Sequence, residues 1–154
     1  MSDQEFENYA TLDISLINLY KGECSFLKNG AVGTYVLNQG KMYCIEGQSL
    51  PMGVVSDAEP YIGKMSLYPG DYVIMMTDGI VDAFAGREEE LERLLQEQRI
   101  VNPQELAEYI VDEAVAQSGG KVNDDMSVVV AAVWERTREN SYVPSYKNRQ
   151  LRLS

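Results

Sequence analysis

The chain has 154 residues, of which 45% are hydrophobic, so it is long enough to fold as one globular domain with a core. Its formal net charge of -11 gives the binding of a phosphate backbone little electrostatic support, and nucleic acid is therefore not expected as a partner. The chain contains no histidine, which excludes Ser-His-Asp and Cys-His catalytic centres and histidine-based zinc sites. Any catalysis must use carboxylates, hydroxyls, basic side chains or a metal held by oxygen.

The sequence shows no sign of a membrane span or of a disulfide framework. No apolar run approaches the roughly 18 residues that a spanning helix needs, and the polar, acidic start SDQEFEN is unlike a signal peptide. We therefore expect a soluble, cytoplasmic chain. Its two cysteines, Cys24 and Cys44, are far apart and lie in strand-like segments, which favours packing thiols over a disulfide.

Residues 9–76 have the pattern of β-strands separated by turns. From Tyr9 to Leu19, apolar and polar residues alternate at period two, which predicts a half-buried strand. Further strands are expected at Cys24–Lys28, Thr34–Leu37, Lys41–Ile45, Tyr61–Leu67 and Tyr72–Met76. The turn residues between the earlier strands favour a meander of hairpins, with a break in the pattern at Ser49–Gly53. The last strand, YVIMM, has no polar alternation, so we expect it to be buried on both faces.

Two helices are predicted after this strand. The first spans Glu88–Gln98, and the second begins with Asn102 as its N-cap and Pro103 as its first helical residue. The pair Gly119-Gly120 is expected to end the second helix. Residues Met126–Val133 then form another continuous apolar strand, which we expect to be buried like YVIMM.

Acidic residues stand where these two apolar strands meet their loops. Asp78 directly follows the first strand, in MMTDGIVDAF, whereas Asp124 and Asp125 precede the second, in NDDMSVVVAAV. If the strands are antiparallel neighbours in one sheet, the carboxylates converge at one edge, where a hard cation such as Mg²⁺ or Mn²⁺ would offset their repulsion. Two interpretations stay open: a metal site at this edge, or a plain Asp78-Gly79 hairpin turn with a solvated Asn123–Asp125 loop.

Six motifs, spread over most of the chain, add a family resemblance. They are YATLDISLINL (9–19), FLKNGAVGTYVL (26–37), SLPMGVV (49–55), YPGDYVIMMTDGIVDAF (68–84), NPQELAEYIVDEAV (102–115) and NDDMSVVVAAV (123–133). In this order they resemble the C-terminal portion of the catalytic domain of metal-dependent serine/threonine protein phosphatases, the PPM superfamily. Within that superfamily the chain is most similar to the bacterial branch of stage II sporulation protein E.

The resemblance implies an α+β fold, a sandwich of two antiparallel β-sheets flanked by helices, here incomplete at its N-terminal side. Residues 1–134 would form the C-terminal portion of the phosphatase domain. Residues 135–154 are polar and basic without periodicity, and we interpret them as a tail. The family's first Asp-Gly motif, whose aspartate bridges two metals, should precede Tyr9, but none of the eight residues before Tyr9 resembles it.

The resemblance also implies the residues of the site. The TDG aspartate maps to Asp78 and the first aspartate of the DDM segment maps to Asp124, both as ligands of Mn²⁺ or Mg²⁺. Gly79 belongs to the same site and would allow the tight turn that presents Asp78. Asp125 would orient Asp124. Asp82 matches a position that binds an additional metal in some members, although a surface carboxylate at a helix start is a simpler account of it.

The activity implied is hydrolysis of phosphoserine or phosphothreonine by water that two metal ions activate, so no catalytic protein nucleophile is expected. We expect a sporulation-type phosphatase that dephosphorylates an anti-sigma-factor antagonist, represented here by a fragment with little activity alone. The alternatives are a catalytically inactive, phosphatase-like interaction module and a phosphatase of the related stress-response branch.

The expected partners follow from the missing first motif. They are the phosphorylated antagonist protein and the upstream half of the same domain. Without that half, the chain would expose an apolar sheet face and unpaired strand edges, and would self-associate. The expected location is the bacterial cytoplasm, at the septum if an upstream membrane region exists.

Overall fold

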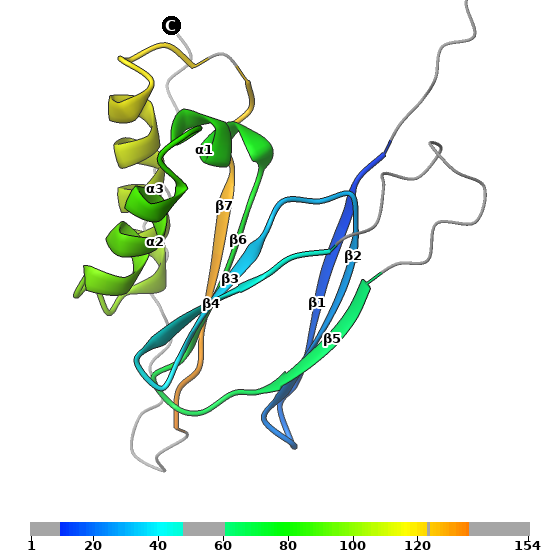
Figure 1. Cartoon of the computed structure of the whole chain (residues 1–154). Coiled ribbons are helices and arrows are strands. Elements are labelled where there is room, and N and C mark those ends of the chain that lie inside the picture. The colour runs from blue at the N-terminus through cyan, green and yellow to red at the C-terminus, as the bar shows by residue number, and fades with distance from the viewer. Residues whose placement is uncertain (1–9, 48–60, 123, 136–154) are drawn as a thin grey trace, which may run out of the picture.

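The computed structural model describes residues 10–47, 61–122 and 124–135 (Figure 1). Its strands are β1 (Leu12–Asn18), β2 (Glu23–Asn29), β3 (Thr34–Asn38), β4 (Lys41–Ile45), β5 (Tyr61–Ser66), β6 (Tyr72–Met76) and β7 (Val128–Ala132). Its helices are α1 (Asp78–Ala83), α2 (Glu88–Glu97) and α3 (Pro103–Gln117). The predicted break at Ser49–Gly53, and the tail beyond Glu135, lie outside the described residues.

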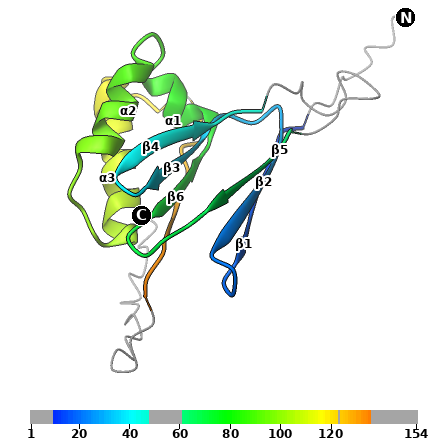
Figure 2. The same ribbon diagram turned by 60° about the horizontal axis from the view of Figure 1, so that its bottom comes forward.

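The strands form two antiparallel sheets, with the orders β1-β2-β5 and β4-β3-β6-β7. The hairpins β1–β2 and β3–β4 are as predicted. The prediction of one continuous meander is wrong. The chain passes from the three-stranded sheet to the four-stranded sheet between β2 and β3, and it returns to the three-stranded sheet at β5. The predicted fold class, α+β with antiparallel sheets and helices, is confirmed. Figure 2 shows the described helices covering only the four-stranded sheet.

Two cores follow from this layering. One lies between the four-stranded sheet and the helices, and Ile74, Ile80, Leu91 and Ile110 are fully buried in it. The second lies between the two sheets, and its buried members are Cys24, Phe26, Val36, Leu67 and Val73. The four-stranded sheet is therefore covered on both faces, which explains why the all-apolar segment YVIMM forms a buried strand, as predicted.

The second apolar strand differs from the prediction. Val129, in β7, has 63% of its surface exposed, so β7 is not buried on both faces. The reason is its position, because β7 is the edge strand of its sheet, next to β6 on one side only. A continuous apolar run predicts a strand but does not distinguish a central position from an edge position.

The predicted starts of the longer helices are confirmed. The Asn102 side chain accepts hydrogen bonds from the backbone N–H groups of Gln104 (2.9 Å) and Glu105 (3.4 Å), and Pro103 is the first residue of α3. The helix ends at Gln117 with Ser118 as its C-cap, and the two glycines that follow Ser118 have positive φ. None of the described helices has both the length and the apolar character needed to cross a bilayer.

The outer face of the three-stranded sheet is apolar and uncovered by any described element. Ile14 and Leu16 of β1 are 46% and 68% exposed, and Ile62 of β5 is 66% exposed. Ile14, Leu27 and Ile62 occupy one row across the three strands. The alternation in β1 thus predicts the strand correctly, but its apolar residues face outward and its polar residues Asp13 and Ser15 face the other sheet. We call Leu12, Ile14, Leu16, Leu27 and Ile62 the outer apolar face.

Both cysteines are free thiols, as predicted. Burial raises the pKa of the Cys24 thiol from its ordinary 9.0 to about 11. Burial, with the charge of Glu46 nearby, raises the pKa of Cys44 to about 11 as well. At pH 8 the thiolate fraction then falls about 100-fold relative to an unperturbed thiol.

We therefore expect iodoacetamide to label both cysteines about 100-fold more slowly in the folded chain than in the urea-unfolded chain at pH 8. The labelling rate should increase as the pH rises towards 11, because the thiolate then forms. Mass spectrometry of quenched time points measures both rates. Equal rates in the folded and unfolded chains would contradict the burial of these thiols.

Candidate metal-binding edge

The TDG segment connects β6 to α1 and does not form a hairpin turn. Asp78 is the first residue of α1 and Thr77 is its N-cap residue, with φ of -80° and ψ of 161°. A helix beginning at Asp78 was not predicted, although a helix start was the simpler account of Asp82, and the hairpin interpretation of Asp78-Gly79 is wrong. The Gly79 N–H donates to the Asp78 side chain, to Oδ1 at 3.1 Å. The Asp78 carboxylate therefore stands at a helix start, where backbone N–H groups favour negative charge.

Gly79 is required for a different reason from the one predicted. It does not have the positive φ that would demand glycine in a tight turn. Instead, a Cβ atom at this position would lie 2.6 Å from the backbone carbonyl oxygen of Asp125 and 3.5 Å from the carbonyl carbon of Asp124. Only a residue without a side chain allows Asp124 and Asp125 to approach α1 this closely.

The condition set for the shared edge is met, because β6 and β7 are antiparallel neighbours. Met76 pairs with Val128 at the end of the ladder, so the residues after β6 and the residues before β7 lie at one edge of the sheet. Figure 1 shows this edge at the top of the view, where β6 runs into α1. We call the residues Thr77–Gly79 and Asp124–Ser127 the metal edge.

Thr77 connects the two segments of the metal edge by hydrogen bonds, a role that was not predicted from the sequence. Its N–H donates to the Ser127 carbonyl oxygen at 3.0 Å, and its hydroxyl donates to the Asp125 carbonyl oxygen at 2.8 Å. The same hydroxyl accepts from the Ser127 N–H at 2.9 Å. A β-branched residue with a hydroxyl at the first position of TDG was the available signal, because such a side chain can bond two backbone groups at once.

Asp124 and Asp125 are both exposed on the loop before β7. The backbone N–H of Asp125 donates to Asp124 Oδ1 at 2.7 Å, which holds the Asp124 carboxylate against its own loop. This bond comes from the backbone of Asp125, whereas the resemblance implied an orienting role for the residue as a whole.

The exposed Asp82 lies one helical turn after Asp78 on α1. Among the described residues, no group of three or more acidic or cysteine side chains is close enough to surround a metal ion. The structure thus brings the backbones of the Asp78 and Asp124 segments together, while the described residues supply only part of a ligand set.

The chemistry of this edge is that of hard oxygen donors. Asp78, Asp82, Asp124 and Asp125 are exposed carboxylates, with no histidine anywhere in the chain. Such donors suit Mg²⁺ and Mn²⁺ and do not suit the soft or borderline metals that need thiolate or imidazole.

Comparison with protein families gives a match over most of the chain. The model described as stage II sporulation protein E matches residues 1–134. The protein of that name from Priestia megaterium is 32% identical over 148 residues, covering 94% of this chain and 25% of the relative. The protein of the same name from Bacillus subtilis (strain 168) is 29% identical over 141 residues, covering 90% of this chain and 17% of the relative. The chain thus spans a quarter or less of these relatives.

Solved structures give the same result. The manganese-presoaked phosphatase domain of the cell fate determinant SpoIIE from Bacillus subtilis superimposes with a TM-score of 0.72 at 28% identity, covering 83% of this chain and 58% of that domain. A crystal form of the same domain without domain swapping gives 0.73, with coverage of 87% and 60%. The catalytic domain of the phosphatase PstP, in complex with two manganese ions, gives 0.61 at 20% identity, which shows a shared fold alone.

Proposed function

Since the chain belongs to the family of stage II sporulation protein E, we propose that it supplies the metal edge of a Mn²⁺- or Mg²⁺-dependent protein serine phosphatase. The observation that carries this proposal is the close approach of the TDG segment to Asp124 and Asp125. A Cβ on Gly79 would clash with the Asp125 backbone, and Thr77 is hydrogen-bonded to both Asp125 and Ser127. Two carboxylate-bearing segments, 46 residues apart at Asp78 and Asp124, are thereby held at one sheet edge.

The residues present fit a hard divalent cation in their chemistry. Asp78 and Asp124 would hold the metal, and the manganese named with the related phosphatase domain supports the choice of ion. When bound, the metal would supply activation of water for attack on a phosphoserine. This chain's own part is to fix the carboxylates, through Thr77 and through the bond from the Asp125 N–H to Asp124.

The described residues do not complete a set of metal ligands, and they do not cover the outer apolar face of the three-stranded sheet. This chain covers only 58% of the related phosphatase domain, and its outer apolar face is open to solvent. We therefore propose that the upstream half of the domain packs on the outer apolar face and supplies the remaining ligands. Burial of Ile14, Leu16 and Ile62 would contribute about 1.5–3 kcal/mol for each side chain fully covered. Without that half, the same face favours self-association.

The proposed substrate is a phosphoserine on an anti-sigma-factor antagonist protein. Its support is the match to sporulation proteins at 29–32% identity. The likeness to the RsbU and RsbW domains of a Mycobacterium tuberculosis protein is at 16% identity, which concerns the fold alone and does not favour the stress-response branch. The second candidate function is an inactive interaction module, which the incomplete ligand set among the described residues favours.

A complementation assay tests the proposed function. The chain alone should hydrolyse p-nitrophenyl phosphate at the buffer rate in Mn²⁺, because the ligand set is incomplete. Addition of a polypeptide carrying the upstream part of the Bacillus subtilis SpoIIE phosphatase domain should raise the rate at least 100-fold. Release of nitrophenolate, followed by absorbance, measures both rates.

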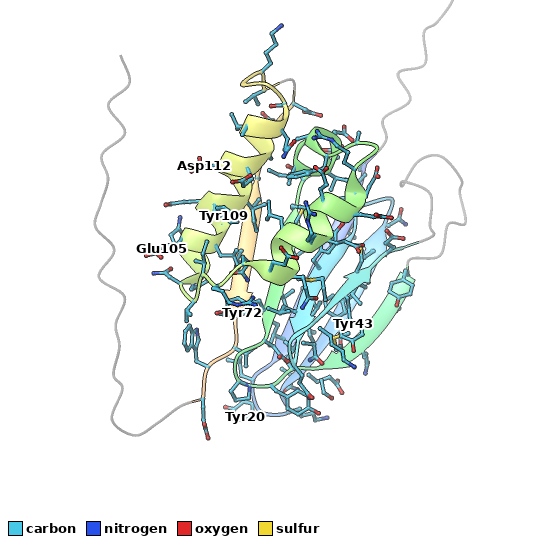
Figure 3. The ribbon with its side chains drawn as sticks, turned by 60° about the vertical axis from the view of Figure 1, so that its left-hand side comes forward. Tyr20, Tyr43, Tyr72, Glu105, Tyr109 and Asp112 are labelled. Carbon is cyan, nitrogen blue, oxygen red and sulfur yellow. The ribbon has the colours of Figure 1, made fainter. Side chains whose placement is uncertain are left out.

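The matched control is Asp78→Asn in the same mixture, which should return the rate to the buffer value. Asp112→Asn, on the solvent side of α3 (Figure 3), should leave the restored rate unchanged. An associated but inactive mixture would instead favour the interaction module. Activity that survives Asp78→Asn would place the chemistry elsewhere.

A further inference from the structure

A buried polar cluster connects the two sheets. The Lys28 ammonium group donates to Asp13 Oδ2 at 2.6 Å and to Thr34 Oγ1 at 2.8 Å. The Thr34 hydroxyl in turn donates to Asp13 Oδ2 at 2.8 Å. Asp13 and Lys28 belong to the three-stranded sheet, and Thr34 belongs to the four-stranded sheet. We call these three residues the cross-sheet brace.

The brace is enclosed. The Lys28 side chain is 0% exposed and the Asp13 side chain is 16% exposed, and Thr34 is fully buried. An ion pair in such a place loses most of its hydration, and apolar side chains of similar size are often at least as stabilising. Asp13 Oδ1 is also buried, and within the described part of the chain it has no hydrogen-bond partner. Stability alone therefore does not account for the brace.

The position of the cross-sheet brace relative to the metal edge explains its presence better. Thr34 is the first residue of β3, and the next residue, Tyr35, pairs with Ile74 of β6. The antiparallel register then places Thr34 level with Met75, two residues before Thr77. Figure 1 shows the crossover from β2 to β3 at the same end of the molecule as α1. The brace thus joins the other sheet to β3 directly beside the strand that ends at the metal edge.

A charged, hydrogen-bonded contact fixes distance and direction, whereas an apolar contact permits sliding. We propose that Asp13, Lys28 and Thr34 are positioning residues for the metal edge: they fix β3 against the three-stranded sheet and so hold the end of β6 and Thr77 in place. This inference concerns the same site as the proposed function and rests on it for its catalytic meaning. The claim that the brace holds the end of β6 in place rests only on the contacts of Asp13, Lys28 and Thr34.

Two variants separate positioning from general stability. Thr34→Val keeps the shape of the side chain and keeps the Lys28–Asp13 ion pair, but it removes the hydrogen bonds to β3. The triple variant D13L/K28M/T34V replaces the whole brace by apolar side chains and guards against a folding defect in the first variant. Lys64→Met is the matched control, because it breaks an exposed ion pair, to Glu23, in the same sheet.

Amide hydrogen exchange by NMR on the full chain without metal is the measurement. The reporters are the N–H groups of Thr77 and Ser127, which are bonded within the metal edge, and the reference is the Leu106 N–H of α3. In both brace variants we expect the two reporters to exchange about 10-fold faster relative to Leu106. In Lys64→Met the ratio should stay unchanged.

A general loss of stability would accelerate all three amides together and leave the ratio constant, which would overturn the inference. A ratio that also changes in Lys64→Met would overturn it as well. Because no metal is present, these outcomes do not depend on the proposed function. Failure of Mn²⁺ to bind the unsubstituted chain would count against the metal edge, while the exchange ratio would still decide whether the brace positions it.

Discussion

Substitution of Lys28 by methionine is expected to lower the free energy of unfolding by roughly 3 kcal/mol. The Asp13 carboxylate, 16% exposed and now without its cation, would keep only the Thr34 hydroxyl as a partner. A buried charge that loses its counter-ion costs far more than the pair contributed, because its desolvation is no longer offset. Urea denaturation, followed by the fluorescence of Trp134 or by circular dichroism, gives the free energy.

The double variant D13L/K28M should recover most of this loss, since it leaves no unpaired charge between the sheets. Lys64→Met provides the comparison, because Lys64 is 64% exposed and lies 3.7 Å from Glu23. An exposed pair of this kind contributes about 0–1 kcal/mol. Equal effects of Lys28→Met and Lys64→Met would show that the brace is solvated and would contradict its burial.

Gly79→Ala is expected to destabilise the chain by roughly 2 kcal/mol or more. Two effects oppose each other at this position. Alanine favours a helix over glycine by about 1 kcal/mol, which would stabilise α1. The added Cβ would lie 2.6 Å from the Asp125 carbonyl oxygen, a backbone atom that cannot rotate away. The clash should prevail and push Asp124 and Asp125 away from α1.

The control is Ala83→Gly in the same helix, which should cost about 1 kcal/mol from helix propensity, together with the loss of one partly buried methyl group. Thermal unfolding of both variants measures the effects, and the chemical shifts of Asp124 and Asp125 amides should move in Gly79→Ala only. A stabilised Gly79→Ala variant would mean that helix propensity decides at this position, and that the close approach to Asp125 is not maintained.

The sequence predicts that the acidic segments share one sheet edge, but it does not predict the local structure of that edge. The all-apolar segment YVIMM indicates a buried strand, and the acidic segments on either side of two such strands indicate a shared edge; the pairing of β6 with β7 confirms that edge. The six-residue helix α1 was missed because one and a half turns carry too little periodicity to identify. The Asp-Gly pair then favoured a turn, since dipeptide signals are local and do not include the approach of Asp125.

Local sequence patterns also could not predict which face of a strand is buried or which residues of different strands are in contact. The alternation in β1 is the same whichever face is buried, so it could not show that Asp13 turns inward and Leu16 outward. The partners Asp13, Lys28 and Thr34 belong to three different strands, and nothing in the spacing of one strand identifies a charged contact with another. Position in the sheet likewise decides the exposure of Val129 in β7.

The central claim is that Asp78 and Asp124 lie together as metal ligands, and paramagnetic NMR with Mn²⁺ tests it most directly. In the unsubstituted chain, we expect substoichiometric Mn²⁺ to broaden the amide signals of Asp78, Gly79, Asp124 and Asp125 first. Asp78→Asn and Asp124→Asn should each abolish the selective broadening, because one carboxylate alone holds the ion too weakly. Selective broadening of the same signals in the double variant would contradict the claim.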